Sequence, residues 1–392
     1  SDWSSDVCSS DLNCFDGKAG RRSAHPGTIM NLALTEMRRS KLRFGLLAGA
    51  VSLLVFLVLL LTTLSTALVN SITGALKGVD ATVLVYSAQA RDNLQASRLE
   101  PAAVEAVAGV DGVSAAGPIS TLTTSAALKD GTEDLQVFGF QPGQPGAPTG
   151  LSDGRLPQSA DEVAMDGGGY EIGDTLELTA ADKQLEVVGL LRGAQFSATP
   201  TAYVTEDLYG QIVRATNPNV PFVPVNAVAV ITDQDAATVV SSINEQVPGT
   251  KAYTKDDAVS LIPGVASISQ TFGILVGLTF IIGIVVIGFF FLILTVQKMK
   301  SFTLLRAIGA GTGRLARVVA LQIAVVVLLA SAIAVVLTLL AVRGLNSGIP
   351  VSLSPGLVAG TVLAVLVFSL LAGLLSIRRI SKIDPFTAAG AR

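Results

Sequence analysis

The stretch FGILVGLTFIIGIVVIGFFFLILTV, residues 272–296, contains no charged residue and is long enough to cross a membrane as a helix. About 20 apolar residues suffice for such a crossing. Three more stretches have the same character: LLAGAVSLLVFLVLLLTTLSTAL (46–68), VVALQIAVVVLLASAIAVVLTLLAV (318–342) and LVAGTVLAVLVFSLLAGLLSI (357–377). The pattern predicts an α-helical membrane protein with four transmembrane helices.

A long segment of mixed composition, residues 70–265, separates the first two predicted helices. It contains short β-branched runs such as ATVLVYSA (81–88) and amphipathic patterns such as DAATVVSSINEQV (235–247). These patterns predict a large α+β domain in which a β-rich insert lies between βαβ-like elements. The run QPGQPGAPTG (141–150) predicts a loop that separates two subdomains.

Basic residues gather beside the predicted helix ends and set the orientation of the chain. They form three groups, which are Arg38, Arg39, Lys41 and Arg43; Lys298, Lys300, Arg306, Arg314 and Arg317; and Arg378, Arg379, Lys382 and Arg392. Short loops rich in lysine and arginine stay in the cytoplasm. We therefore expect a multi-pass plasma-membrane protein with both termini and the 298–317 loop inside, and residues 70–265 extracytoplasmic.

The outer segment is strongly acidic, although the whole chain has a formal net charge of only -3. Residues 70–265 hold 24 acidic and 10 basic side chains. Such a charge disfavours contact with nucleic acid, which is bound through basic side chains. The simplest role of this charge is to keep the outer domain soluble.

The first residues, 1–29, form a Ser/Asp-rich leader without an apolar run or periodicity, and we expect it to be non-native or disordered, with Met30 as the start. Both cysteines and the only histidine lie in this leader. The expected organisation is then a cytoplasmic segment with the first helix (30–69), the outer domain (70–265), and the last three helices with a tail (266–392).

No pattern in the chain predicts catalysis or a bound cofactor. The chain has no G-x-x-x-x-G-K-[ST] phosphate loop, and GGGY (167–170) has the pattern of a turn. Three acidic pairs lack the spacing of a calcium loop and are expected to be solvated turn residues; they are Glu133 and Asp134, Asp161 and Glu162, and Asp256 and Asp257. We therefore predict no catalytic residue and no metal site.

Three glycine pairs have the G-x-x-x-G spacing that lets membrane helices approach closely. These candidate helix-packing residues are Gly45 and Gly49, Gly273 and Gly277, and Gly356 and Gly360. Such pairs could serve contacts within one chain or between two copies of it.

A compact apolar and basic segment, FTLLRAIGA (302–310), lies between the second and third predicted helices. An apolar ridge of this kind suits a groove on a soluble partner protein. The residues alone equally permit an amphipathic helix that lies on the membrane surface without a protein partner.

Two C-terminal segments carry a resemblance to a known family. They are VQKMKSFTLLRAIGAGTGRLARVVALQ (296–322) and SIRRISKIDPFTAAGAR (376–392), and they resemble the permease subunits of ABC transporters of the FtsX/MacB/Lol type. The resemblance extends from Met30 to Arg392. The segment LALTEMRRSKLRFGLLAGAVSLLVFLV (32–58) is similar to the heme-exporter and DevC-like branch.

This resemblance implies a permease subunit without an ATPase motif of its own, which works as a homodimer surrounded by membrane lipid. It also implies a separate ABC ATPase subunit, which binds and hydrolyses ATP. It implies that the loop after the second helix contacts the ATPase, and that ATP-driven motion passes through the first two helices to the outer domain. The implied coupling residues are Lys298, Lys300, Phe302, Leu305, Arg306, Ala307, Ile308 and Gly309. The expected function is export of a hydrophobic or amphipathic compound; the alternative is an FtsX-like mechanical regulator that activates an extracytoplasmic cell-wall hydrolase.

Overall fold

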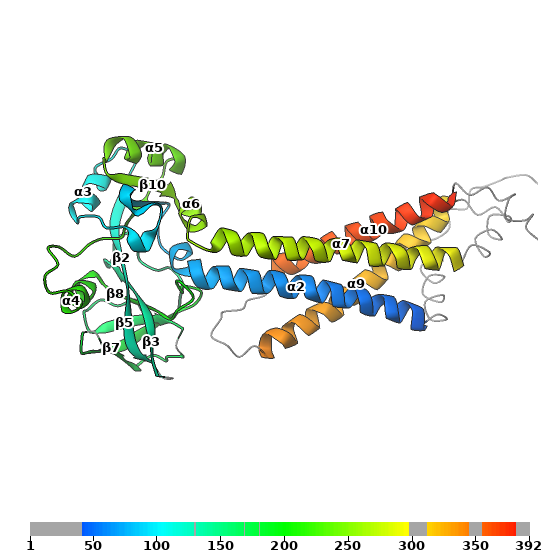
Figure 1. Ribbon diagram of the computed structural model, residues 1–392, viewed down its shortest axis with the longest axis horizontal. Coiled ribbons are helices and arrows are strands. Elements are labelled where there is room, and N and C mark those ends of the chain that lie inside the picture. Colours follow the sequence, from blue (N-terminus) through cyan, green and yellow to red (C-terminus); the bar gives the residue numbers. More distant parts are fainter. Residues whose placement is uncertain are drawn as a thin grey trace, which may run out of the picture.

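The computed structural model describes residues 41–128, 131–167, 169–179, 181–297, 312–344 and 355–381. These residues form two parts, a mixed α/β outer domain and an elongated bundle of helices (Figure 1). The outer domain sits at one end of the bundle, where α2 and α7 enter it side by side. The leader 1–29 and the predicted coupling residues between 298 and 309 lie outside the described residues.

The described part of the bundle consists of four helices: α2 (Lys41–Lys77), α7 (Val265–Gln297), α9 (Thr312–Gly344) and α10 (Pro355–Ser381). By length and composition, three described segments can cross a membrane, namely Phe44–Lys77, Val265–Phe290 and Ala320–Gly344. The described apolar part of α10, Pro355–Leu371, is shorter. Three of the four predicted transmembrane helices are thus confirmed as apolar helices of spanning length, and the fourth stays a prediction.

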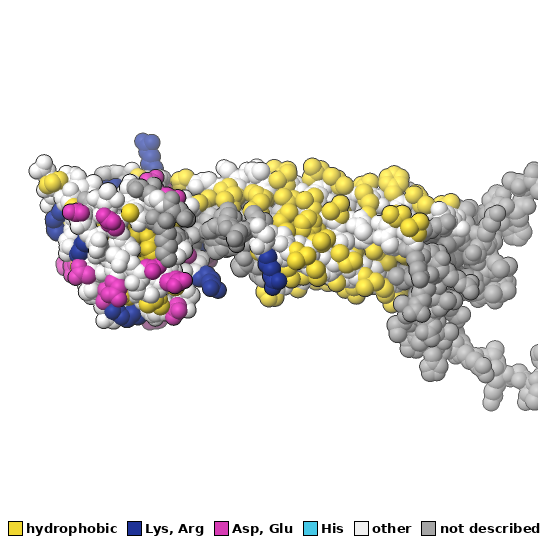
Figure 2. All heavy atoms as spheres, turned by 90° about the horizontal axis from the view of Figure 1, so that it is seen from below, with side chains coloured by type: hydrophobic (Ala, Val, Ile, Leu, Met, Phe, Trp, Pro, Cys, Tyr) yellow, Lys and Arg dark blue, Asp and Glu magenta, His cyan; other side chains and the backbone are white. Residues whose placement is uncertain are grey.

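One face of α2 packs against α9 through residues spaced one turn apart. Leu47, Val51 and Val55 are buried there together with Val326 and Ala330 of α9. Much of the remaining bundle surface is apolar and exposed, and it forms the yellow region in Figure 2, whereas charged side chains gather on the outer domain. This division is typical of a protein whose helices face lipid and whose domain faces water.

One half of the outer domain is a split β-α-β arrangement. Its four strands lie in the order β10-β1-β9-β2, and each neighbouring pair is antiparallel. The strands are β1 (Val83–Ser87), β2 (Ala115–Leu128), β9 (Ala227–Ile231) and β10 (Thr250–Thr254). Helix α3 (Ala102–Ala108) connects β1 to β2, and α5 (Ala236–Gln246) connects β9 to β10. This connectivity is the ferredoxin-like topology.

The two faces of this half-sheet have different partners because successive strand residues point to opposite sides. Val83 and Val85 share a core with Val107 of α3 and Val239 of α5. Leu84 and Tyr86 face the other way and belong to a second core. That second core also contains the outer end of α2, so the sheet rests with one face on the membrane helices.

The other half is the predicted β-rich insert between β2 and β9. It comprises β3 (Gly131–Phe140), β4 (Leu151–Gly154), β5 (Glu162–Asp166), β6 (Thr175–Leu178), β7 (Lys183–Leu191), β8 (Thr201–Thr205) and α4 (Glu206–Thr216). Strand β2 joins the halves, because its first residues pair with β9 and the remainder pairs with β3. The expected α+β domain with a β-rich insert is therefore confirmed.

The predicted loop 141–150 is a loop, but the prediction that it separates two subdomains is wrong. The Asp80 N–H donates to the Ala147 carbonyl (2.9 Å), and the Gly146 N–H donates to the Asp80 carbonyl (3.0 Å). The loop is thereby fixed against the chain that leaves α2. The two halves of the outer domain instead meet along β2, which is hydrogen-bonded to β9 in one half and to β3 in the other. Because one continuous strand belongs to both halves, amino-acid composition does not mark the boundary between them.

Candidate functional site: the joint between the membrane helices and the outer domain

Helix α2 is longer than a membrane crossing requires. Its 37 residues span about 55 Å at about 1.5 Å per residue, whereas the hydrocarbon core of a bilayer is about 30 Å thick. Ala75 and Leu76, close to its C-terminal end, are buried in the same core as Leu84 and Phe138 of the outer domain. The helix therefore continues from the membrane into the domain as one element.

The segment 193–199 connects β7 to β8, and we call it the joint segment. Its backbone bonds directly to the last turns of α2. The Ala75 N–H donates to the Gln195 carbonyl (2.9 Å), the Ser197 N–H to the Ile72 carbonyl (3.2 Å), and the Ala198 N–H to the Ser71 carbonyl (2.9 Å). These bonds attach the insert to α2, although the two are far apart in sequence.

Gly74 makes this close contact possible. A β-carbon at this position would overlap the carbonyl oxygen of Gly193 and would lie 3.0 Å from the carbonyl oxygen of Gln195. Both obstacles are backbone atoms, so they cannot move aside as the end of a flexible side chain could. The joint thus requires glycine at position 74 because any larger residue would separate the helix from the joint segment.

The joint segment holds two residues in a left-handed backbone conformation. Ser197 has a φ of 54° and Ala198 a φ of 59°. Each such non-glycine residue costs on the order of 1–3 kcal/mol, and such residues persist only where their surroundings determine the conformation. Here the hydrogen bonds of both residues to α2 supply that constraint.

Asp166, at the end of β5, holds the other side of the joint segment. Its side chain accepts a hydrogen bond from the Ala194 N–H, and the Tyr203 hydroxyl donates to the Ala194 carbonyl (2.6 Å). Burial raises the pKa of Asp166, an effect that the N–H groups of Ala194 and Gly193 oppose. Asp166 is 6% exposed, so its carboxylate is buried where it fixes the segment that α2 contacts.

Helix α7, which follows the outer domain in the sequence, reaches the same core beside α2. Strand β10 pairs with β1 and leads into α6 (Lys255–Ser260), which precedes α7. Ala258, Ile262 and Val265 lie in the core that contains the end of α2. The two helices that enter the membrane therefore share one packed core, and this core with the joint segment is what we call the joint.

Away from the joint, a groove of about 510 Å³ lies between α3 and α4 and is lined by charged side chains. Its walls carry Glu105, Glu206 and Asp207, with Arg214 also in the lining. Glu206 Oε1 accepts a hydrogen bond from the Ser120 hydroxyl (2.8 Å), whereas its buried Oε2 has no hydrogen-bond partner among the described residues. Burial raises the pKa of Glu206 to about 7, and the neighbouring Asp207 adds to the shift.

Among the described residues, the predicted glycine pairs do not lie at contacts with another helix of the same chain. A β-carbon at Gly45, Gly49, Gly273 or Gly277 would meet no described atom within 4 Å, and the same holds for Gly360. Gly356 is exposed as well. The close contact within the chain is instead at Gly283 of α7, where a β-carbon would overlap the side chain of Leu54.

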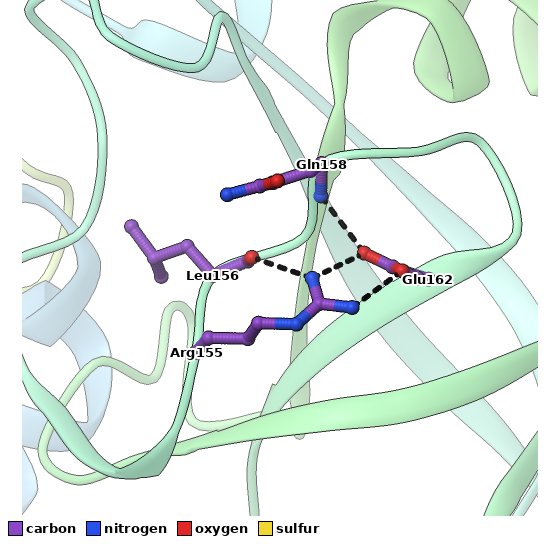
Figure 3. Close-up of polar contacts among 4 residues, drawn as sticks. All are labelled: Arg155, Leu156, Gln158 and Glu162. Atoms are coloured by element: carbon purple, nitrogen blue, oxygen red, sulfur yellow. Dashed lines mark hydrogen bonds and ion pairs between the residues drawn. The ribbon is translucent and has the colours of Figure 1, made fainter.

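The expectation that the acidic pairs are turn residues is wrong for two of them, because Glu133 and Asp134 lie in β3 and Asp256 and Asp257 lie in α6. The third pair, Asp161 and Glu162, is engaged in local contacts. Arg155 forms a two-pronged ion pair with Glu162 (2.6 and 2.7 Å), while the Gln158 N–H donates to the same carboxylate (2.9 Å; Figure 3). These contacts, chiefly the hydrogen bond from Arg155, lower the pKa of Glu162 to about 2. Asp161 pairs with Lys183 (2.9 Å). Within the described ranges, no three His, Cys, Asp or Glu side chains are grouped to hold a metal ion.

The sequence pattern missed the residues that build the joint. Gly74 lies in an apolar helix that contains many small residues, and Asp166 follows an ordinary strand pattern. Their roles depend on residues 193–195, which come later in the chain. The continuation of the first predicted helix to Lys77 was the one available signal, because it exceeds the length that a membrane crossing needs.

Among known protein families, the match falls on the C-terminal membrane part of the chain. Residues 273–385 match the family described as FtsX-like permease C-terminal. An ABC transporter permease of Mycobacterium bovis, itself uncharacterised, is 27% identical over 344 residues, which cover 85% of this chain and 93% of the relative. A Staphylococcus haemolyticus protein assigned by name to a hemin transport system as its permease HrtB is 22% identical over 369 residues, covering 92% of this chain and 99% of the relative.

Two solved structures are similar to the outer domain. The extracellular domain of the noncanonic ABC-type transporter YknZ from Gram-positive bacteria gives a TM-score of 0.31 at 14% identity, covering 44% of this chain and 100% of that one. The periplasmic region of MacB from Actinobacillus actinomycetemcomitans gives 0.33 at 10% identity, covering 46% and 92%. Residues 273–385 thus form an FtsX-like permease C-terminal domain, and along most of its length the chain is similar to proteins named as ABC transporter permeases.

Proposed function

We propose that this chain transmits motion, driven by ATP hydrolysis in a separate ABC ATPase, from the membrane to its outer domain. The joint is the observation that carries the proposal. Helix α2 enters the domain without a break, and three backbone hydrogen bonds attach it to the joint segment. A displacement of α2 in the membrane would therefore act directly on β7 and β8. Because α7 enters the same core, a change in the distance between the two helices would act on the domain as well.

The proposed contact with the ATPase is the 298–317 loop, of which residues 298–311 lie outside the described range. We expect Leu305→Ala/Arg306→Glu to weaken ATPase association about tenfold or more. Loss of a buried leucine costs roughly 1.5–3 kcal/mol, and each 1.4 kcal/mol or so corresponds to a factor of ten. The measurement is co-purification of the ATPase together with its permease-stimulated ATP hydrolysis.

A matched control for this double variant is Arg214→Glu, which reverses an exposed charge on α4 in the outer domain. It should leave both readouts unchanged. If Leu305→Ala/Arg306→Glu also retained both at the natural level, the loop would not be the coupling element, and the alternative of a membrane-surface helix would replace it.

The proposed orientation has both termini in the cytoplasm and the outer domain outside. In a chain that starts at Met30 and so lacks cysteine, we expect Ser152→Cys to react with a membrane-impermeant thiol reagent on intact cells. Ser152 is exposed on β4. Ser301→Cys should react only after the cells are opened. Labelling at 301 but not at 152 on intact cells would reverse the topology.

The proposed cargo is a hydrophobic or amphipathic compound, and the direction is export. Relatives that are named for hemin transport support a heme-like molecule as the first candidate. Beyond the leader the chain has no histidine, so an iron ligand would have to be one of Met37, Met165 or Met299, a tyrosine or a carboxylate. Met165 is 1% exposed and unsuited to capture. ATP-dependent hemin movement in vesicles that hold the permease and its ATPase would separate export from the alternative, activation of a cell-wall hydrolase.

We also propose that two copies of the permease pair in the membrane. The observation in favour is that Gly45, Gly49, Gly273 and Gly277 lie on open helix surfaces of a single chain. Close approach of small residues is what such a pairing needs. Cross-linking of single cysteines at these positions would test it.

A further inference from the structure

The groove between α3 and α4 lies at the end of the outer domain that is remote from the bundle (Figure 1). Helix α3 belongs to the ferredoxin-like half and α4 to the β-rich insert, so both halves of the domain form its walls. Its volume of about 510 Å³ lies within the range of roughly 300–1,000 Å³ that is common for ligand sites. The groove is therefore large enough to hold several residues of an extended chain.

One part of the groove lining is apolar. It comes from the start of α3, from β2 and from the loop before β9, and it consists of Pro101, Val104, Pro118, Val223 and Val225. Next to Val223 in this loop, the side chain of Phe222 is 40% exposed. Aromatic side chains are enriched where proteins meet one another. The lining and the exposed aromatic ring together favour a protein partner that brings apolar side chains of its own.

The charged part of the lining is available to a partner. Glu105 of α3 and Asp207 of α4 are exposed carboxylates on the two walls, and Arg214 is exposed as well. None of these three side chains has an ion-pair partner among the described residues. With Glu206, the lining holds three carboxyl groups and one guanidinium. Charges that meet across an interface are arranged to be complementary, so this surplus of carboxyl groups favours a basic partner.

Gly210 of α4 also lines the groove, although the fold itself does not require a glycine there. A β-carbon at this position would lie 3.6 Å from Arg214 Nη1 and 3.6 Å from Val223 Cγ2, which is ordinary contact distance. Glycine inside a helix is less stable than alanine. A side chain longer than that of alanine would press on Arg214 and Val223, both of which line the groove. The glycine thus keeps the groove wide at a cost to the stability of α4.

We infer that the groove between α3 and α4 is a docking site for an extended, basic segment of a partner protein. Apolar side chains of this segment would lie on Val104, Pro118 and Val225, and a lysine or arginine between them would pair with Glu105 or Asp207. The segment would contact both halves of the outer domain at once. That the partner is extracytoplasmic rests on the proposed orientation of the chain, whereas binding itself does not.

The test uses the full chain from Met30 in phosphatidylcholine nanodiscs and three capped tetrapeptides that carry a neutral fluorescent dye. The peptides are Leu-Arg-Leu-Arg, Leu-Glu-Leu-Glu and Ser-Arg-Ser-Arg. Fluorescence anisotropy should show saturable binding of the first peptide. The other two should bind about fivefold more weakly or worse, since one lacks the basic and the other the apolar contacts. Equal binding of either one, or equally strong competition by acetylarginine amide alone, would overturn the inference.

Variants of the carboxylates separate the groove from the general charge of the domain. Glu105→Gln/Asp207→Asn should weaken binding of Leu-Arg-Leu-Arg about fivefold, as expected for the loss of two exposed ion pairs. The matched control, Glu177→Gln/Glu245→Gln, removes the same charge from exposed positions on β6 and α5 and should leave the affinity unchanged. Arg214→Glu should tighten binding. An equal loss in both double variants would attribute the attraction to the whole domain and overturn the groove as the site.

Variants of Gly210 test the space. Gly210→Leu should narrow the groove and abolish peptide binding without lowering the melting temperature, because leucine is the better helix former. Gly210→Ala, whose methyl group fits, should bind the peptide as the natural chain does. Retained binding in a folded Gly210→Leu chain would overturn the inference, and so would the absence of saturable binding in the natural chain. None of these readouts needs the ATPase, so failure here is distinct from failure of the ATPase-coupling experiment.

Discussion

Gly74→Ala is expected to detach the joint segment from α2. The added methyl group would overlap the Gly193 carbonyl oxygen and crowd that of Gln195. Overpacking of this kind costs about 1–3 kcal/mol, which corresponds to a roughly 5- to 150-fold change in a local opening equilibrium. Hydrogen exchange at the amides of Ala75, Ser197 and Ala198, which form the three bonds across the joint, should accelerate by that factor.

The matched control is Gly45→Ala in the same helix, where the added methyl group would meet no described atom within 4 Å. This variant should leave the three amides unchanged. Under the proposed function, Gly74→Ala should also keep its ATPase but lose transport activity, because the contact on the cytoplasmic side is untouched. Full transport with a detached joint segment would show that motion reaches the outer domain by another route.

Glu206→Gln is expected to stabilise the outer domain at pH 8 by about 1–3 kcal/mol, since a pKa shift of one unit corresponds to about 1.4 kcal/mol. Burial raises the pKa of Glu206 to about 7, compared with 4.5 for an ordinary glutamate. The folded state therefore binds the proton more tightly than the unfolded state, so stability falls as the pH rises from about 4.5 through about 7. Glutamine removes this loss, because it is neutral and can still accept the hydrogen bond from Ser120.

The measurement is the thermal unfolding of the full chain from Met30, followed by the near-ultraviolet circular dichroism of tyrosine at pH 5 and pH 8. All the tyrosines lie in the outer domain, so the signal excludes the membrane helices. The natural protein should melt at a lower temperature at pH 8 than at pH 5, and Glu206→Gln should reduce that difference. Glu245→Gln, which neutralises an exposed carboxylate on α5 away from the groove, is the control and should behave like the natural protein. An unchanged difference in Glu206→Gln would place the pH dependence elsewhere.

Features that depend on local pattern could be predicted from the sequence. Apolar runs identify the membrane helices because a bilayer leaves the backbone few alternatives to the helix. Alternation in 81–88 and amphipathic spacing in 235–247 predicted β1 and α5 correctly, since each element buries one face. Strand β10 was missed: its five residues, TKAYT, are short and mostly half-exposed, and their role comes from pairing with β1.

Features that depend on distant residues could not be predicted. Gly74 looks like any helix glycine until the Gly193 carbonyl is placed against it. The G-x-x-x-G pairs show that local spacing can also suggest a contact that is not made. Although their spacing suits close helix packing, these glycines meet no other described helix of the same chain. The predicted coupling residues, between 298 and 309, lie outside the described range, so their assignment continues to rest on the resemblance and on the matched family.

The pairing of β1 with β10 has a consequence for how such a chain can change over evolutionary time. Because these strands are hydrogen-bonded neighbours, the polypeptide enters and leaves the outer domain at adjacent points. The same holds one level further in, since β2 and β9, which flank the β-rich insert, are also paired. Segments whose ends lie close together can be gained, lost or exchanged with little disturbance of their host. The β-rich insert is thus an insertion within the outer domain, which is itself an insertion between α2 and α7. Either insertion can change in sequence or size while α2 and α7 keep their spacing.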